Sequence, residues 1–254
     1  MPIKKADDPA DVVVINARCF KVTEFYIDDM IENLLKEASK NRITLSAQDR
    51  DLLLEAKETQ SSYIKANVKE SAMRTATIVI CDVIEKLNSF AEEGEKASIL
   101  VFLPGLAEIF QFIEYMSEFY DKLWLKQNLE LIPLHSSLNE EEQDRAFKKV
   151  DRMEGRRKVI VSTNLAESSI TIPDVKYVID FMLTKEVHYD PASRSESLQL
   201  TWCSRANATQ RAGRAGRVSD GFTFRMVTKQ FYKNSMPAYP MPEMQRCPLE
   251  KLIL

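Results

Sequence analysis

The chain has 254 residues, of which 44% are hydrophobic, enough for one large core or for a core with a helical insert. The net charge of -3 and the pI of about 5.7 exclude a global basic field, so any nucleic-acid site must be local. Four scattered cysteines without CxxC spacing favour reduced thiols in an intracellular protein over a metal site, and neither a signal peptide nor a membrane span is predicted.

The first third of the chain is the least informative. Residues 1–16 are expected to form a lead-in. Residues 20–26 alternate in polarity, which is typical of a strand, and residues 28–39 place apolar side chains on one helical face. Residues 48–90 indicate two or three helices, and the region of about 40–75 is expected to be a solvated insert. A partner-binding role for that insert is the alternative.

From residue 98 onward, short apolar runs alternate with amphipathic helices. This alternation predicts right-handed βαβ crossovers and therefore an α/β fold with a parallel sheet. The expected strands are 98–103, 129–134, 158–162, 176–180 and 221–226, the expected helices are 106–116 and one capped by Asn139, and a β-hairpin is expected at 184–201.

Polar residues follow the ends of several of these strands. Pro104-Gly105, His135-Ser136 and Thr163-Asn164 each come directly after a strand. In parallel sheets ligands bind beyond the carboxyl ends of the strands. We therefore expect the chemistry of this chain to converge on one edge of the sheet.

The segment 204–218, SRANATQRAGRAGRV, carries three arginines, Arg211, Arg214 and Arg217, that recur every third residue. On a helix, Gln210, Arg214 and Arg217 would lie within about 60° of each other, and Arg211 would lie to the side. Two glycines and repelling like charges both disfavour a plain helix, so an anionic ligand is expected to compensate. Arginine matches phosphate oxygens in geometry, which favours phosphate binding over a solvated basic helix.

This segment also carries a resemblance to a known family. QRAGRAGR (210–217) resembles the sixth motif of the DEAH-box RNA helicases, and STNLAESSITI (162–172) resembles the fifth. ILVFLPGLAEI (99–109) is similar to the fourth motif, with Pro104 where many members have Thr, and LHSSL (134–138) is similar to the short motif that contacts the RNA backbone.

The resemblance implies a domain organisation. Residues 17–240 would form the second RecA-like lobe, with a protruding β-hairpin and the helical insert. Residues 241–254 would begin the connection to C-terminal helical modules. The branch of closest resemblance is the Tudor-domain DEAH helicases of the germline piRNA pathway (Spindle-E type), and the RNA helicase A branch is its neighbour.

The resemblance also implies a nucleotide site for ATP. Arg214 and Arg217 would be arginine fingers, and Gln210 would position the attacking water. The expected nucleotide-binding residues are Ser169 at the γ-phosphate, Thr171 at the ribose, Phe147 stacked on adenine, and Arg211. An ordinary core position is the alternative for Phe147, and Pro173 stands where the family often has an acidic ribose contact.

For RNA, the matching positions are Gly105, Ser136, Ser137 and Thr163, whose amides and hydroxyls suit backbone phosphates. Capping of a helix or turn is the alternative for the two serines. His188 on the hairpin would stack on a base, unless the hairpin is simply solvated.

The chain contains neither GxxxxGK[ST] nor a DEAH tetrapeptide. We therefore expect the phosphate-binding loop and the Mg²⁺ ligands to lie on another lobe of the same protein, and the isolated chain to be inactive. The implied setting is an RNA-dependent ATPase that binds single-stranded RNA, in the cytoplasm or in perinuclear germ granules (nuage), with piRNA-pathway partners and no membrane. The competing hypotheses are a catalytically silent RNA-binding or scaffold lobe and a DNA helicase.

Overall fold

The structure is a computed structural model, and it describes residues 20–39, 70–89, 97–120, 122–148, 155–168, 172–190, 195–217 and 219–246. The lead-in and most of the predicted insert lie outside these residues. None of the helices in the described part of the chain is long and apolar enough to cross a bilayer.

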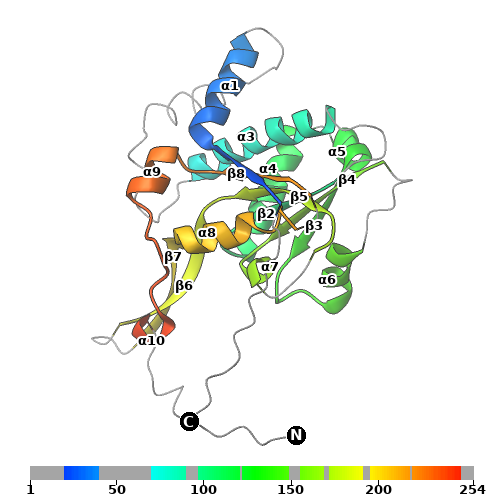
Figure 1. The fold of residues 1–254 in the computed structure, drawn as a ribbon. Coiled ribbons are helices and arrows are strands. Elements are labelled where there is room, and N and C mark those ends of the chain that lie inside the picture. The colour runs from blue at the N-terminus through cyan, green and yellow to red at the C-terminus, as the bar shows by residue number, and fades with distance from the viewer. Residues whose placement is uncertain are drawn as a thin grey trace, which may run out of the picture.

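A six-stranded parallel sheet forms the centre of the molecule (Figure 1). Its strand order is β1-β8-β5-β2-β4-β3, and every neighbouring pair is parallel. The strands are β1 (Val22–Tyr26), β2 (Ser98–Phe102), β3 (Leu129–Leu134), β4 (Arg157–Ser162), β5 (Val175–Asp180) and β8 (Gly221–Arg225). The predicted α/β fold is confirmed, and so are the six predicted strands to within two residues at either end.

The neighbouring strands β2 and β4 explain why short apolar runs in the sequence predicted buried strands. Every residue of β2 and of β4 is buried, as expected for strands covered on both faces by helices. Side chains alternate along β2, so Ile99 and Val101 join one core cluster while Leu100 and Phe102 join the other.

Helices cover both faces of the sheet (Figure 1). One face is covered by α1 (Ile27–Ser39), α3 (Glu70–Ser89), α4 (Leu106–Phe119) and α5 (Lys122–Asn128), whose apolar residues share a cluster with Ile99 and Val159. The other face is covered by α6 (Glu140–Phe147), α7 (Leu165–Ser168) and the turns around Ala215.

Two consecutive basic residues open β4 and attach helices on opposite faces. Arg157 donates hydrogen bonds to the carbonyls of Leu87 (2.9 Å) and Ala97 (2.6 Å). The carbonyl of Leu87 lies in the last turn of α3, where no intrahelical donor is available. Lys158 donates to the carbonyls of Ala146 (3.0 Å) and Lys148 (2.8 Å) at the end of α6. Burial lowers the pKa of both Arg157 and Lys158.

The predicted hairpin is present outside the sheet. It consists of β6 (Leu183–Asp190) and β7 (Ser195–Trp202), paired antiparallel. A third apolar cluster joins the base of the hairpin to α8 (Arg205–Ala212) and α9 (Lys229–Asn234), and α10 (Glu243–Arg246) lies against β6 through a hydrogen bond from Arg246 to the carbonyl of Val187.

Several helices differ from the prediction. The described part of region 48–90 is the single helix α3, and its start at Glu70 puts residues 70–75 of the expected insert inside that helix. Four short helices, α5, α7, α9 and α10, were not predicted. The arginine segment is also only partly helical, because α8 ends at Ala212 and hydrogen bonds from residue i to i−3 follow it.

Candidate nucleic-acid and nucleotide interface

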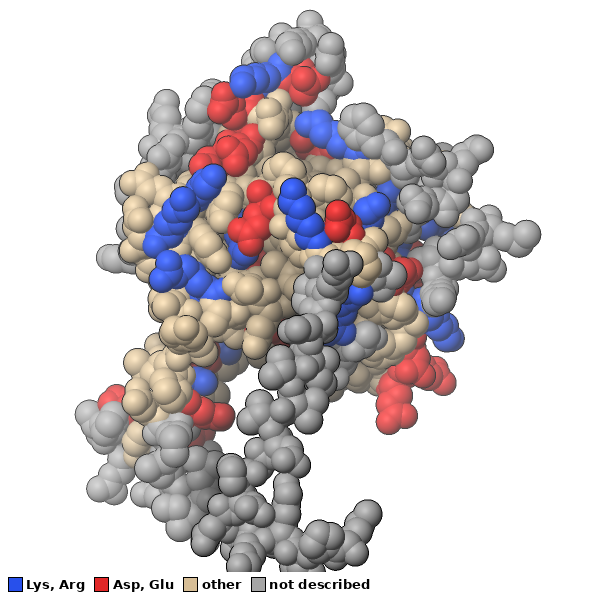
Figure 2. Space-filling model, viewed as in Figure 1, with Lys and Arg blue, Asp and Glu red and all other residues tan. Residues whose placement is uncertain are grey.

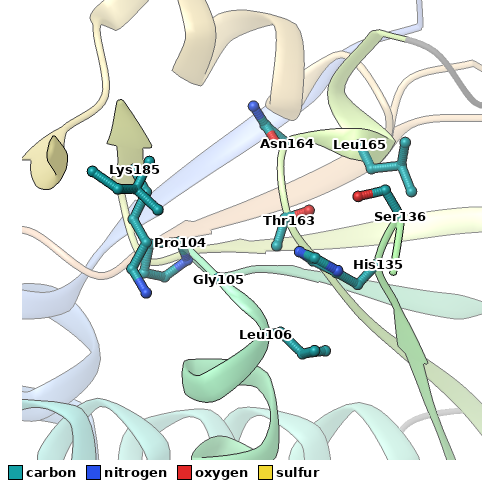
Figure 3. Close-up of a pocket in the computed structure, with 10 residues that line it drawn as sticks. Pro104, Gly105, Leu106, His135, Ser136, Thr163, Asn164, Leu165 and Lys185 are labelled. Carbon is teal, nitrogen blue, oxygen red and sulfur yellow. The ribbon is translucent and has the colours of Figure 1, made fainter. Parts of the chain in front are cut away.

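An open pocket of about 460 Å³ lies at the carboxyl ends of the central strands (Figure 3). Pro104 and Gly105 follow β2, His135 and Ser136 follow β3, and Thr163 follows β4. The pocket is completed by Leu106, Asn164, Leu165, Lys185 and Leu198. The predicted convergence at one edge of the sheet is therefore confirmed.

The backbone fixes these loops at a common level. The amide of Leu103 donates to the carbonyl of Ser162 (2.8 Å), and the amide of Phe181 donates to the carbonyl of Phe102 (3.2 Å). These bonds continue the strand ladder one step beyond the sheet. Because of these bonds, the residues that directly follow each strand are held at the pocket rim.

Gly105 is the N-cap of α4, so the positive end of a 14-residue helix opens beside the pocket. A Cβ atom built on Gly105 would lie 2.7 Å from Oε2 of Glu108 and 2.8 Å from Nζ of Lys185. These two groups form an ion pair of 2.9 Å. Gly105 therefore lies where the start of α4, the Glu108 carboxylate and the Lys185 ammonium group meet.

The segment after β3 forms a turn that exposes both predicted serines. The amide of Ser137 donates to Nδ1 of His135 (3.1 Å), and Ser136 lines the pocket while Ser137 does not. The cap of α6 is Asn139, whose side chain accepts from the amide of Glu142 (2.8 Å) in a capping box. Neither serine therefore caps α6, while the turn-capping half of the alternative stays open.

The hairpin residues that line the pocket do not include His188, whose stacking on a base stays a prediction. Side chains alternate between the two faces of a strand, and Lys185 and His188 are three residues apart, so they lie on opposite faces of β6. Lys185 lines the pocket, whereas His188 is not among its lining residues and has Nε2 at 4.0 Å from Glu186. The second hairpin residue at the pocket is Leu198, which is 64% exposed.

Arg211 is buried among acidic side chains. Its Nε donates to Glu167 (3.0 Å) and its Nη1 to Asp180 (2.9 Å), and the side chain is 2% exposed. Burial alone would lower the pKa of Arg211, but the charges of Asp180 and Glu167 outweigh burial and raise it. In this structure Arg211 ties α8 to β5 and α7, and a nucleotide contact for it stays a prediction.

Glu167 connects the pocket to the arginine segment. Its carboxylate accepts from Asn207 (2.6 Å) and Arg211, and its backbone carbonyl accepts from Arg214. Glu167 lies two residues after Leu165, which lines the pocket. The short helix α7 thus connects the pocket rim directly to the arginine segment.

The remaining arginines present positive charge next to this junction. Arg214 is 8% exposed, and burial and the charge of Arg217 both lower its pKa. Arg217 and Gln210 are exposed. Figure 2 shows that basic and acidic side chains are interspersed over the visible face, so a phosphate site here depends on local geometry rather than on a broad basic field.

Gly216 explains part of the glycine pattern. A Cβ atom on it would lie 2.8 Å from Cγ2 of Val22 and 3.0 Å from the carbonyl oxygen of Phe20. At Gly216 the chain therefore approaches the side chain of Val22 and the backbone of Phe20 too closely for a larger residue. The turn is fixed further by the amide of Phe20, which donates to the carbonyl of Gly216 (3.3 Å).

Two predicted nucleotide residues, Ser169 and Thr171, lie outside the described residues. Phe147 is partly buried and packs against the apolar cluster between α6 and the sheet. This position agrees with a core role, and stacking on adenine remains a prediction. The described residues contain no group of three or more His, Cys, Asp or Glu that could hold a metal ion.

Comparison with known proteins identifies the domain. Residues 79–219 match the helicase conserved C-terminal domain. The chain is 37% identical over 257 residues to the ATP-dependent RNA helicase TDRD9 of Homo sapiens and 36% identical over 247 residues to the probable ATP-dependent RNA helicase spindle-E of Aedes aegypti. These alignments cover 100% and 96% of this chain but only 17% and 16% of the relatives' length.

The fold has solved counterparts. The E. coli DExH-box NTPase HrpB matches with a TM-score of 0.65 and 24% identity, over 93% of this chain and 23% of that chain. At this identity the likeness concerns the fold alone, which is an α/β RecA-like lobe. The family match, the parallel sheet and the motif positions agree, and the chain belongs to the helicase conserved C-terminal domain family.

Proposed function

We propose that this chain is the second motor lobe of an ATP-dependent RNA helicase and that its pocket binds the backbone of single-stranded RNA. One observation carries the proposal: Gly105, Ser136 and Thr163, from three separate strand ends, line one pocket together with Lys185. A helix N-terminus, hydroxyl groups and a lysine suit phosphate oxygens. Such contacts hold a strand without reading its sequence, as a motor requires.

The second part of the proposal concerns ATP. Arg214 and Arg217 act as arginine fingers on ATP that a first RecA-like lobe holds, and Gln210 positions the attacking water. The pKa of Arg214 is lowered by burial and by Arg217, so a phosphate between them would relieve their repulsion. Mg²⁺ requires oxygen ligands, and we assign them to the first lobe, because arginines and a glutamine suit phosphate instead.

The third part concerns the whole protein. Residues 17–240 are the lobe, and residues 241–254 lead to C-terminal modules. Relatives named ATP-dependent RNA helicase TDRD9 and spindle-E support a parent protein of the same kind. From the family resemblance we extend the proposal to germline piRNA silencing of transposons, with piRNA-pathway partners in the cytoplasm or nuage.

The motor part is tested by ATP turnover of the intact protein with and without single-stranded RNA. An arginine finger contributes about 10³–10⁵ in rate, so Arg214→Ala and Arg217→Ala should each abolish most RNA-stimulated turnover. RNA affinity should change little. Arg205→Ala is the matched control, because Arg205 begins the same helix but donates to the carbonyl of Lys233 on α9 (3.3 Å).

Unchanged turnover in Arg217→Ala, the exposed member of the pair, would remove this segment from the ATP site. Wild-type protein that binds RNA without hydrolysing ATP would instead support a silent RNA-binding lobe. A preference for DNA over a matched RNA strand would contradict the choice of nucleic acid.

A further inference from the structure

Lys185, which lines the pocket, forms an ion pair with a residue that is distant in the sequence. Glu108 lies in the first turn of α4 and Lys185 lies on β6, and their charged groups are 2.9 Å apart. Their side chains are 22% and 28% exposed, respectively, so both remain in reach of solvent and of a ligand. Lys185 lines the pocket (Figure 3), and the Glu108 carboxylate reaches it from the first turn of α4.

The carboxylate occupies a position that suits an anion. Oε2 of Glu108 lies 2.7 Å from the place where a Gly105 Cβ would stand, beside the start of α4. The positive end of a helix and a lysine ammonium each attract negative charge. A backbone phosphate that enters the pocket meets the same two attractions, and it meets Lys185 already paired with Glu108.

We propose that Glu108 is an internal substitute for an RNA phosphate: it neutralises Lys185 while the pocket is empty and is displaced from it when the strand binds. This inference rests on the proposed RNA-binding function. Its consequence is that Glu108 weakens the grip on RNA. A motor that steps along a strand must release each phosphate it holds, and a carboxylate that returns to Lys185 assists that release.

The test measures binding of a fluorescent, mixed-sequence single-stranded RNA to the intact protein over a series of salt concentrations. Glu108→Gln removes the charge and keeps the shape. An exposed ion pair contributes up to about 1 kcal/mol, so binding should tighten by about twofold to fivefold. The slope of log K against log salt should steepen by up to about 0.7, as expected for one more phosphate contact on a single strand.

Two further variants isolate the pair. Lys185→Gln should weaken RNA binding. Adding Glu108→Gln to it should have no further effect, because the lysine for which Glu108 and the RNA phosphate compete is then absent. Glu130→Gln is the matched control: Glu130 pairs with Arg145 at 3.2 Å, has a side-chain exposure of 27%, and does not line the pocket. It changes the net charge equally and should leave both affinity and slope unaltered.

Unchanged or weaker RNA binding by Glu108→Gln would overturn the inference, and so would an equal gain in the Lys185→Gln background. The proposed function is tested separately by Thr163→Val, which removes a pocket hydroxyl. If Thr163→Val weakens binding while Glu108→Gln has no effect, only the inference fails. If wild-type protein binds no single-stranded RNA, both fail. A misfolded variant would not mimic the expected result, which is a gain of affinity.

Discussion

The atoms of Val22 and Phe20 that pack against Gly216 leave no room for a side chain there. Gly216→Ala should destabilise the fold by about 1–3 kcal/mol, because the new methyl group would overlap Val22 and the backbone of Phe20. Gly213→Ala is the control, since Gly213 is exposed, has a helical φ of -60° and would place its Cβ no closer than 3.3 Å to another atom. Urea unfolding of the two variants measures the difference. Equal stability would contradict the close approach.

Tyr26 gives the fold a dependence on alkaline pH. The hydroxyl group of Tyr26 donates a hydrogen bond to the Glu24 carboxylate (3.0 Å). Burial and this neighbouring negative charge raise the pKa of Tyr26 from 10.0 to about 12. Between these two values the unfolded chain loses the phenolic proton and the folded chain keeps it. The stability contribution of this group is therefore complete below pH 10 and is lost as the pH rises toward 12.

Comparison with Tyr26→Phe isolates this effect, since all other groups titrate alike in both proteins. The free energy of unfolding should be measured from about pH 9 to about pH 12. Wild type should lose stability relative to Tyr26→Phe across that interval. A constant difference would show that the pKa of Tyr26 is the same in the folded and unfolded chains.

At the scale of elements, the attachment of α3 depends on one buried side chain. Arg157→Met would leave the carbonyls of Leu87 and Ala97 and the side chain of Asn88 without their charged donor. Hydrogen bonds to charged groups contribute about 1.5–3 kcal/mol each, and relaxation recovers part, so we expect a loss of about 2–4 kcal/mol.

Arg145→Met is the control for this variant. Arg145 is exposed and its pair with Glu130 spans 3.2 Å, so its loss should cost less than about 1 kcal/mol. Chemical denaturation of both variants provides the comparison. A loss below about 1 kcal/mol for Arg157→Met would mean that water replaces the guanidinium at the end of α3.

The elements that could be predicted are those whose structure is determined by a local sequence signal. The strand β2 is a continuous apolar run. The start of α6 is predicted by Asn139 followed by Glu142, which form its capping box. The helix α9 had a similar signal in Thr228, whose side chain accepts from the amide of Phe231, but it was missed. The four-residue helices α7 and α10 are too short for any periodicity to show.

At the scale of the whole molecule, the topology of the sheet made much of the site predictable. Parallel strands place their carboxyl ends together, so Gly105, Ser136 and Thr163 follow from strand positions alone. Lys185 was not predicted, because the faces of the hairpin are set by its packing against the lobe. The pairing of Arg211 with Glu167 and Asp180 could not be predicted either, because these partners lie 44 and 31 residues away, beyond any local pattern.

The central claim is that RNA backbone phosphates enter the pocket beyond β2, β3 and β4. The most direct measurement is a structure of the intact protein bound to single-stranded RNA. We expect phosphate oxygens within hydrogen-bonding distance of Thr163 and Ser136 and of the Gly105 amide, with Lys185 turned from Glu108 toward the strand. RNA held elsewhere on the lobe, with the Glu108–Lys185 pair intact and the pocket empty of phosphate, would contradict the account.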